Sequence, residues 1–207
     1  MNIFSFDMDF VENFLKLFFK KMIIISSGNL KGTKLFVPEG RMVRPSSGRT
    51  RAAIFNTLQH RFDLRDFLIW DAYAGSGSLG LEAFSRGASP IVFTEKKPAN
   101  FKILIKNLEK CALSHQCAHR MSALQWLDSS LEPSKIMVFL DPPYQSDELS
   151  KIIPKLALSK KILTRSVVIA ETDSKITLNW PSQFILFFSR KYGRSKIEIA
   201  EKLEMAR

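Results

Sequence analysis

The chain has 207 residues, of which 45% are hydrophobic and 25% charged, so it is long enough for a compact domain with a substantial core. Lysine and arginine outnumber aspartate and glutamate by 31 to 20, and the formal net charge is +11. This excess favours a polyanionic partner, with a generally basic surface as the alternative. The two cysteines, Cys111 and Cys117, and three histidines follow no zinc-binding or disulfide pattern, which predicts no metal site and a reducing, cytoplasmic location.

Residues 1–21 do not match a targeting signal, because Asp7 and Glu12 stand where a secretory signal carries positive charge. Apolar residues recur at helical spacing from Phe10 to Phe18, which is compatible with a partner helix or an interfacial anchor, but this stretch is too short to span a bilayer. We interpret the segment as an extension that is either loosely attached or the product of a misassigned start.

Residues 22–66 are expected to form a small N-terminal unit. Two strand-like runs, 22–26 and 33–37, flank a glycine-containing turn and predict a β-hairpin. An amphipathic helix is predicted from about Thr50. Arginines gather before and at the start of this helix, where they could contact a phosphate backbone: Arg41, Arg44, Arg49 and Arg51.

Strand-like and helix-like segments alternate across residues 67–207. This alternation predicts an α/β fold with a parallel sheet covered on both faces. The last two strands should pair as an antiparallel hairpin, and the cations between them form a second basic cluster of Arg190, Lys191 and Arg194. We therefore predict seven strands, at 67–71, 90–95, 117–121, 136–140, 166–171, 183–189 and 196–201, and helices near 79–85, 99–110, 122–127 and 146–156.

A glycine loop, Asp71-Ala72-Tyr73-Ala74-Gly75-Ser76-Gly77-Ser78-Leu79-Gly80, follows the first strand of this sheet. It contains the G-x-G-x-x-G spacing of a dinucleotide-binding loop. However, Asp71 would repel a pyrophosphate and would favour the ammonium group of an amino acid. Glu95 closes the next strand, where its carboxylate can accept from ribose hydroxyls. S-adenosylmethionine therefore fits this loop better than NAD, which is the alternative.

The strand at 136–140 ends in Asp141-Pro142-Pro143-Tyr144. The prolines stop the β-ladder and fix the chain direction, so that carbonyl groups can point into a cleft. A carboxylate, a carbonyl and a flat aromatic ring together suit a planar heterocycle that carries an exocyclic amino group. The alternative is a helix-capping acid followed by a rigid turn.

Four polar residues, Asp71, Glu95, Ser122 and Asp141, fall at or just after predicted strand ends. Ligands of open parallel sheets bind outside the carboxyl ends of the strands, so we expect these residues to converge on one edge. Capping of the following helix is an adequate alternative only for Ser122.

Several motifs carry a family resemblance: Arg44-Pro45-Ser46-Ser47-Gly48-Arg49-Thr50-Arg51, Ile54-Phe55-Asn56, the glycine loop extended to Ala83, Ser85-Arg86-Gly87-Ala88, Glu95-Lys96, Asn107-Leu108, Asp141-Pro142-Pro143-Tyr144 and Tyr192-Gly193. Together they resemble the bacterial 16S rRNA (guanine(966)-N(2))-methyltransferases, from Met22 to about Ala200. The resemblance implies a Rossmann-like class I methyltransferase fold, S-adenosylmethionine as donor without a metal, and a guanine of 16S rRNA in the small subunit or its assembly intermediate as acceptor. We expect the protein to act as a monomer in the cytoplasm.

The candidate site combines these motifs. We assign the methyl-transfer site to Asp141, Pro142, Pro143 and Tyr144, and cofactor binding to Asp71, Ala72, Tyr73, Gly75, Gly77, Glu95, Lys96, Ser122 and Ala123. We assign RNA contacts to Arg41, Arg44, Arg49, Arg51, Arg190, Lys191 and Arg194.

Three residues depart from the family pattern. Gly48 and Ser122 stand where the family usually has acids, and Arg194 replaces an acidic or polar residue. These departures concern cofactor and RNA contacts.

Two other functions are compatible with the motifs: methylation of adenine N6 or cytosine N4 in a nucleic acid, and a non-catalytic RNA-binding assembly factor.

Overall fold

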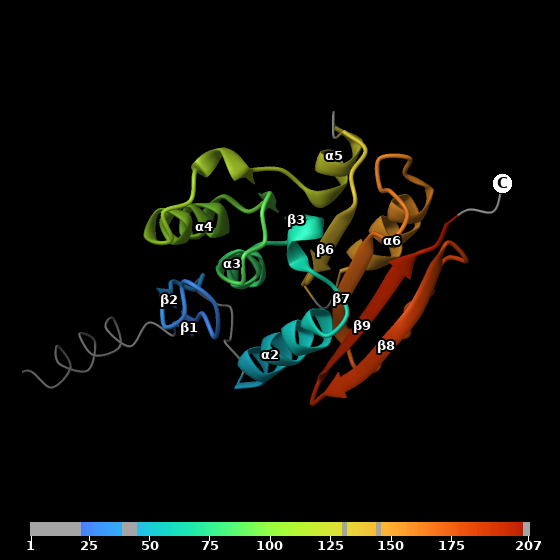
Figure 1. Ribbon diagram of the computed structural model, residues 1–207, viewed down its shortest axis with the longest axis horizontal. Coiled ribbons are helices and arrows are strands. Elements are labelled where there is room, and N and C mark those ends of the chain that lie inside the picture. Colours follow the sequence, from blue (N-terminus) through green and yellow to red (C-terminus); the bar gives the residue numbers. More distant parts are fainter. Residues whose placement is uncertain (1–21, 39–44, 130–131, 144–145, 205–207) are drawn as a thin grey trace, which may run out of the picture.

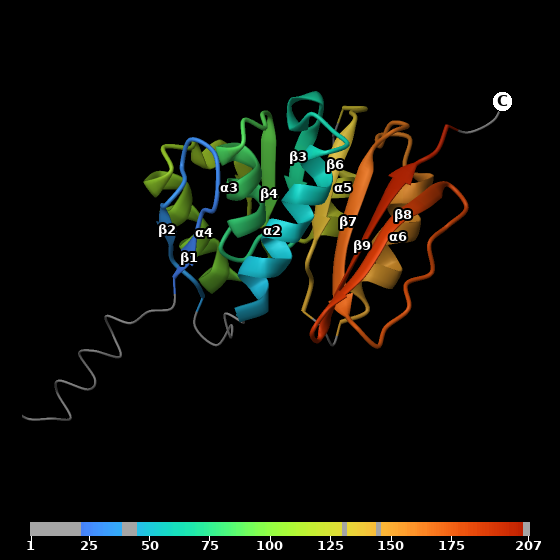
Figure 2. The same cartoon turned by 60° about the horizontal axis from the view of Figure 1, so that its bottom comes forward.

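The computed structural model describes residues 22–38, 45–129, 132–143 and 146–204 (Figures 1 and 2). Its strands are β1 Ile23–Ile24, β2 Lys34–Leu35, β3 Leu68–Asp71, β4 Ile91–Thr94, β5 Ala118–His119, β6 Ile136–Leu140, β7 Val167–Asp173, β8 Phe184–Tyr192 and β9 Ser195–Lys202. Its α-helices are α2 Pro45–Gln59, α3 Ser78–Ser85, α4 Pro98–Lys110, α5 Ala123–Asp128 and α6 Glu148–Leu158, and short 3₁₀ helices span Leu64–Asp66 and His115–Cys117.

Seven of these strands form one sheet in the order β5-β4-β3-β6-β7-β9-β8, and β1 and β2 form a separate antiparallel pair. The strands from β5 to β7 are parallel, whereas β9 runs antiparallel to both β7 and β8. The predicted fold class is confirmed: a mostly parallel α/β sheet with a C-terminal antiparallel hairpin and a small N-terminal hairpin.

The apolar core is divided between the two faces of the sheet, because successive strand side chains point in opposite directions. On one face, strand residues pack with α2, α3 and α4; the rings of Phe55 and Phe139 lie 5.6 Å apart between their centroids. On the other face, strand residues pack with α5 and α6; the rings of Trp70 and Trp126 lie 4.2 Å apart. Figures 1 and 2 show this three-layered arrangement.

Three elements differ most from the sequence-based expectation. Helix α2 begins at Pro45 rather than near Thr50, because the fixed φ of proline suits a first helical turn. Strand β5 has only two residues, since a 3₁₀ helix precedes it and the amide of Met121 turns back to the carbonyl of His119, 3.0 Å away. The turn between β8 and β9 is only two residues long, with Gly193 at φ +61°, so that β8 extends to Tyr192.

The N-terminal hairpin is fastened to the sheet domain by Glu82 of α3, which is fully buried. Its carboxylate accepts hydrogen bonds from the amide of Ser26 at 2.9 Å and the hydroxyl of Ser26 at 2.6 Å. It also pairs with the guanidinium groups of Arg51 at 3.2 Å and Arg86 at 2.8 Å. Residues 22–66 therefore share the core and the polar interior of the sheet domain.

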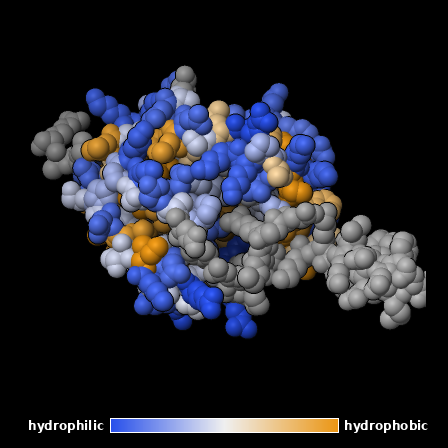
Figure 3. All heavy atoms as spheres, turned by 180° about the vertical axis from the view of Figure 1, so that it is seen from behind, coloured by the Kyte–Doolittle hydropathy of each residue, from blue (hydrophilic) through white to orange (hydrophobic). Residues whose placement is uncertain are grey.

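The surface seen in Figure 3 is largely hydrophilic, with apolar residues in small separate groups. Within the described ranges, no helix is long and apolar enough to cross a bilayer.

Candidate active site

The predicted polar residues meet at the carboxyl edge of the sheet. Backbone pairing places Asp71 beside Phe93 on β4 and beside Phe139 on β6. Glu95 and Asp141 follow these two partners by two positions on the strands that flank β3. Ser122 lies just after β5, the next strand along the same edge.

The carboxylates of Asp71 and Glu95 hold the glycine loop in place. Asp71 Oδ2 accepts from the amide of Gly80 at 2.9 Å, and Glu95 Oε2 accepts from the amide of Gly75 at 2.9 Å. Glu95 Oε1 also accepts from the amide of Lys97 at 2.7 Å. Both acids are more than nine-tenths buried. The expectation that helix capping could explain Ser122 alone was therefore too narrow, because Asp71 also binds an amide of the helix that follows it.

The glycines of the loop allow very close backbone approach. Gly77 has φ +78°, and a Cβ atom there would lie 2.6 Å from a methyl carbon of Leu104. A Cβ atom on Gly80 would lie 2.4 Å from the ring of Phe93. The helix α3 can therefore pack directly against β4 only because these positions carry no side chain, which is the role of glycines in a nucleotide-binding turn.

Ala72 and Ala123, two of the predicted cofactor-binding residues, are buried at 1% and 0% exposure. The amide of Ala72 donates to the carbonyl of Phe139 at 3.1 Å, and its carbonyl accepts from the hydroxyl of Thr94 at 2.8 Å. Ala72 thus ties the start of the glycine loop to the two neighbouring strands, and its contribution to the site comes from the backbone.

Ser122 forms a capping box at the start of α5. Its hydroxyl accepts from the amide of Gln125 at 3.2 Å and donates to the Gln125 side-chain oxygen at 2.9 Å. The same side chain accepts from the amide of Ser122, so that two backbone donors are satisfied reciprocally. The capping role that the sequence allowed for Ser122 is present.

Tyr73 and Lys96 meet at Glu148, the first residue of α6. The Tyr73 hydroxyl donates to Glu148 Oε2 at 3.1 Å, and the Lys96 ammonium lies 2.7 Å from Glu148 Oε1. The hydrogen bond from Lys96 holds the pKa of Glu148 below its usual value. Burial, together with the neighbouring carboxylate, raises the pKa of Tyr73. The cluster joins the glycine loop, the end of β4 and α6. The sequence analysis did not identify Glu148 as a site residue, because its only cue was a position shortly after Tyr144.

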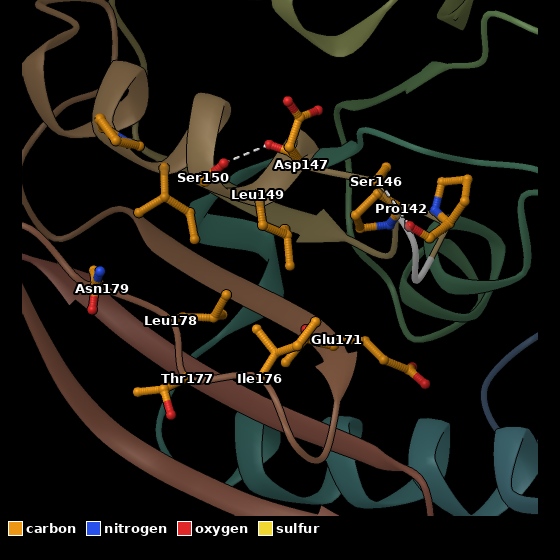
Figure 4. Close-up of a pocket in the computed structure, with 14 residues that line it drawn as sticks. Pro142, Ser146, Asp147, Leu149, Ser150, Glu171, Ile176, Thr177, Leu178 and Asn179 are labelled. Atoms are coloured by element: carbon orange, nitrogen blue, oxygen red, sulfur yellow. Dashed lines mark hydrogen bonds between the residues drawn. The ribbon is translucent and has the colours of Figure 1, made fainter.

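The segment after β6 forms one end of a pocket with a volume of about 460 Å³ (Figure 4). Pro142 is buried and Pro143 is exposed, and the carbonyl of Pro143 accepts from the amide of Ser146 at 3.0 Å and from its hydroxyl at 2.7 Å. The rest of the pocket is lined by the first turns of α6, the end of β7 and residues 176–179. Tyr144 lies outside the described residues.

The cations assigned to RNA contact fall into three groups. Arg41 and Arg44 lie outside the described residues. Arg51 is buried against Glu82 and also donates to the carbonyl of Ile24, so it serves the protein interior and offers no guanidinium to solvent. The others are exposed: Arg49, Arg190, Lys191 and Arg194.

The turn between β8 and β9 lies at the same edge of the sheet as Asp141. The amide of Ser174, just after β7, donates to the carbonyl of Arg194 at 2.8 Å. Asp173 at the end of β7 pairs with Ser195 at the start of β9. In Figure 2 this turn and the start of α2 both lie at the bottom of the molecule, together with the end of β6. The exposed cations of the β8–β9 turn and the start of α2 therefore lie at the edge that carries Asp141.

A family model described as Conserved hypothetical protein 95 matches residues 22–201. The chain belongs to this family. A family relative named Ribosomal RNA small subunit methyltransferase D, from Buchnera aphidicola subsp. Acyrthosiphon pisum, is 31% identical over 172 residues, covering 82% of this chain and 89% of the relative. The protein of that name from Haemophilus influenzae is 30% identical over 177 residues, covering 84% of this chain and 91% of the relative.

Solved structures share the fold of this chain. The methyltransferase yhhF from Escherichia coli superposes with a TM-score of 0.76 at 28% identity, over 89% of this chain and 99% of its own. TrmN from Thermus thermophilus, at 19% identity and a TM-score of 0.62, shares the fold. The family resemblance drawn from the sequence motifs is confirmed.

Within the described part of the chain, no three histidine, cysteine or carboxylate side chains lie close enough together to hold a metal ion.

Proposed function

We propose that this protein transfers a methyl group from S-adenosylmethionine to the exocyclic N2 amine of a guanine in 16S rRNA. The relatives named above carry names that assign them to small-subunit ribosomal RNA. The observation that carries the proposal is the position of Asp141-Pro142-Pro143 at the end of β6. It lies next to the strand that leads into the glycine loop and at one end of a pocket large enough for a nucleobase.

The residues of the glycine loop fit S-adenosylmethionine. Gly77 and Gly80 bring the backbone into close contact with its neighbours, and the carboxylates of Asp71 and Glu95 give this edge a negative charge. Negative charge suits an ammonium and a sulfonium group, and it opposes the pyrophosphate of a dinucleotide. Asp71 would orient the amino-acid part and Glu95 the ribose. When bound, the cofactor supplies an electrophilic methyl group.

The acceptor amine requires help, because its lone pair is delocalised into the purine ring. We infer that Asp141 accepts one N–H of this amine and that the carbonyl of Pro142 accepts the other. This arrangement turns the lone pair out of the ring plane and places acceptors where positive charge develops on nitrogen. Tyr144 stacks on the base. The proton leaves afterwards to Asp141 or to water.

The exposed cations supply the RNA contacts. Arg49 on α2 and the β8–β9 cations lie around the edge that carries Asp141. A single-stranded loop or a loosened junction suits such a site, because the target base must be unstacked to reach the acceptor residues. We further propose that the protein acts as a monomer in the cytoplasm, on the small subunit or its assembly intermediate.

Transfer of a tritiated methyl group tests this proposal. The protein is incubated with labelled cofactor and, in parallel, with hypomethylated small subunits, protein-free 16S rRNA and DNA. We expect label in the small subunits and little in DNA. Label in DNA alone would establish a DNA methyltransferase, and no label with any substrate, despite cofactor binding, would establish a non-catalytic factor.

A further inference from the structure

We propose that Glu171 recognises the ring N1–H of the acceptor guanine and thereby selects guanine over adenine and cytosine. This inference rests on the proposed function, since it concerns the base whose amine Asp141 holds. It assigns a specificity role to a residue that the sequence motifs did not single out.

The register of the sheet places Glu171 beside Asp141. Leu140 on β6 pairs with Ala170 on the parallel strand β7, and Asp141 and Glu171 are the next residues along these two strands. Neighbouring strands lie about 4.8 Å apart. The N2 amine and the N1–H group of guanine are adjacent on one edge of the base. Two carboxylates on adjacent strands therefore match two adjacent groups of donors.

The pocket beside Asp141 is built for a neutral ligand with hydrogen-bond donors. The described residues that line it include Glu171 and Asp147 but no lysine, arginine or histidine. Leu149, Ile153 and Leu178 add apolar walls. Such a lining disfavours a phosphate and suits the face and the donor edge of a nucleobase.

Figure 4 shows Glu171 on β7, with its side chain extending away from Ile176 and Leu178 and away from Leu149 of α6. Glu171 also has an interaction within the protein. A carboxylate has about four acceptor positions on its two oxygens, so it can accept from a base in addition to a protein group. The carboxylate can therefore reach the base from the β7 side while Asp141 holds the amine from the β6 side.

The chemistry of the three amino-bearing bases gives this contact its selectivity. Guanine presents a donor, N1–H, next to its amine. Adenine and cytosine present acceptor nitrogens, N1 and N3, next to theirs. A carboxylate at that position binds guanine and repels the other two, and sites that leave a buried polar group unpaired reject the wrong substrate strongly. Glu171 would thus explain why a tetrapeptide suited to any exocyclic amine acts on guanine.

An analogue of guanine isolates the contact. 2-Aminopurine keeps the N2 amine but carries an acceptor at N1. Small subunits are reconstituted with 16S rRNA that carries either guanine or 2-aminopurine at the methylated position, and initial rates are measured for wild type and Glu171→Gln. We expect wild type to prefer guanine by about 100-fold, and Glu171→Gln to reduce this preference by about tenfold or more, because its side-chain NH₂ can donate to N1. The analogue also lacks O6, but this loss affects wild type and Glu171→Gln alike. It therefore cancels when the guanine preferences of the two proteins are compared.

Two further variants complete the test. Glu201→Gln removes a carboxylate from β9 at the opposite edge of the sheet, where it pairs with Arg165 at 3.6 Å, and should keep the wild-type preference. Glu171→Ala, which supplies neither donor nor acceptor, should also lower the preference. An unchanged preference in both Glu171 variants, with guanine still methylated, would overturn this inference alone. Failure of wild type to methylate guanine at all would overturn the proposed function.

Discussion

Three carboxylates lie on three consecutive strands of the sheet: Asp71 on β3, Asp141 after β6 and Glu171 on β7. The first faces the glycine loop, and the third lines the pocket. Asp141 stands between them, at the point where a methyl donor on one side would meet an amine on the other. This position explains why we assign the transfer step to Asp141 rather than to either neighbour.

Replacing Asp141 should separate binding from chemistry. We expect Asp141→Ala to bind S-adenosylmethionine within about threefold of wild type, because the proposed cofactor contacts lie after β3, β4 and β5 and do not include Asp141. Turnover should fall by about 10²- to 10⁴-fold, since the variant lacks the acceptor for the amine. Titration calorimetry measures the binding, and methyl transfer to small subunits measures the turnover.

A matched control for this variant is Glu109→Ala on α4, a surface carboxylate that contacts His115 at 3.3 Å. It should leave both quantities unchanged. An Asp141→Ala protein that loses cofactor affinity as much as turnover would show that Asp141 belongs to the cofactor site instead.

At the scale of single residues, the sequence predicted the site residues that stand at the ends of recognisable strands. Asp71, Glu95 and Asp141 could be placed because each closes a strand that the apolar pattern reveals. Glu148 and Glu171 could not, because their importance depends on the strand order that brings α6 and β7 beside the glycine loop and Asp141. Arg51 illustrates the converse, since a basic sequence pattern cannot tell an exposed guanidinium from one buried against Glu82.

The elements of the N-terminal hairpin, α2 and α3 meet at the buried carboxylate of Glu82. Burial opposes its ionisation, but hydrogen bonds from Ser26 and the guanidinium groups of Arg86 and Arg51 outweigh this effect and hold its pKa below the usual value. A carboxylate whose pKa is lowered by folding contributes stability that is present above the unfolded pKa, near 4.3, and is lost as the pH falls through the folded value.

Glu82→Gln should therefore change both stability and its pH dependence. We expect a decrease of about 3–5 kcal/mol in the free energy of unfolding at pH 7, because two buried guanidinium groups are left without their counter-ion. The decline in stability below about pH 4.5 should also be shallower than in wild type. Urea denaturation at several pH values measures both effects. Equal acid sensitivity in the two proteins would contradict the assignment of this pKa shift to Glu82.

Two glycines in helices offer a test of packing. Gly80→Ala places a Cβ atom 2.4 Å from the ring of Phe93 and should cost about 1–3 kcal/mol by displacing α3 from β4. Gly48→Ala in α2 meets nothing within 4 Å and should stabilise by about 0.5–1 kcal/mol, because alanine favours a helix. Thermal unfolding of both variants measures the contrast, and similar effects in the two would contradict the packing argument.

At the scale of elements, the existence and type of the strands and helices followed from the apolar pattern, and only their ends differed. The shortness of β5 and the length of β8 depend on hydrogen bonds that the periodicity does not reveal, such as the contact between Met121 and His119 and the register of the final hairpin. The pairing order of the strands, by contrast, is a property of the whole sheet and needed the structure.

At the scale of the whole molecule, the exposed cations of the final hairpin lie at the edge of the sheet that carries Asp141. They lie there because β9 runs back along β7 and returns its turn to the end of that strand. The net charge of +11 predicted a polyanionic partner but not where it would bind. The fold leads us to propose this edge as the binding surface.

Salt dependence tests the proposed RNA surface. A variant with glutamine at Arg190, Lys191 and Arg194 should bind the small subunit more weakly. The slope of log affinity against log salt concentration should become shallower by about 0.7–0.9 for each phosphate that the variant no longer neutralises. A control with glutamine at Lys135, Lys160 and Arg165, cations at the opposite edge of the sheet, should keep the wild-type slope. Equal slopes in all three proteins would contradict this surface.

The most direct measurement identifies the atom that receives the methyl group. Hypomethylated small subunits are treated with the protein and isotopically labelled S-adenosylmethionine, and the rRNA is digested to nucleosides and analysed by mass spectrometry. The structure of the edge around Asp141 predicts that the label is recovered as N2-methylguanosine. Recovery as N6-methyladenosine or N4-methylcytidine, or the absence of labelled nucleoside while the labelled cofactor binds, would contradict this account.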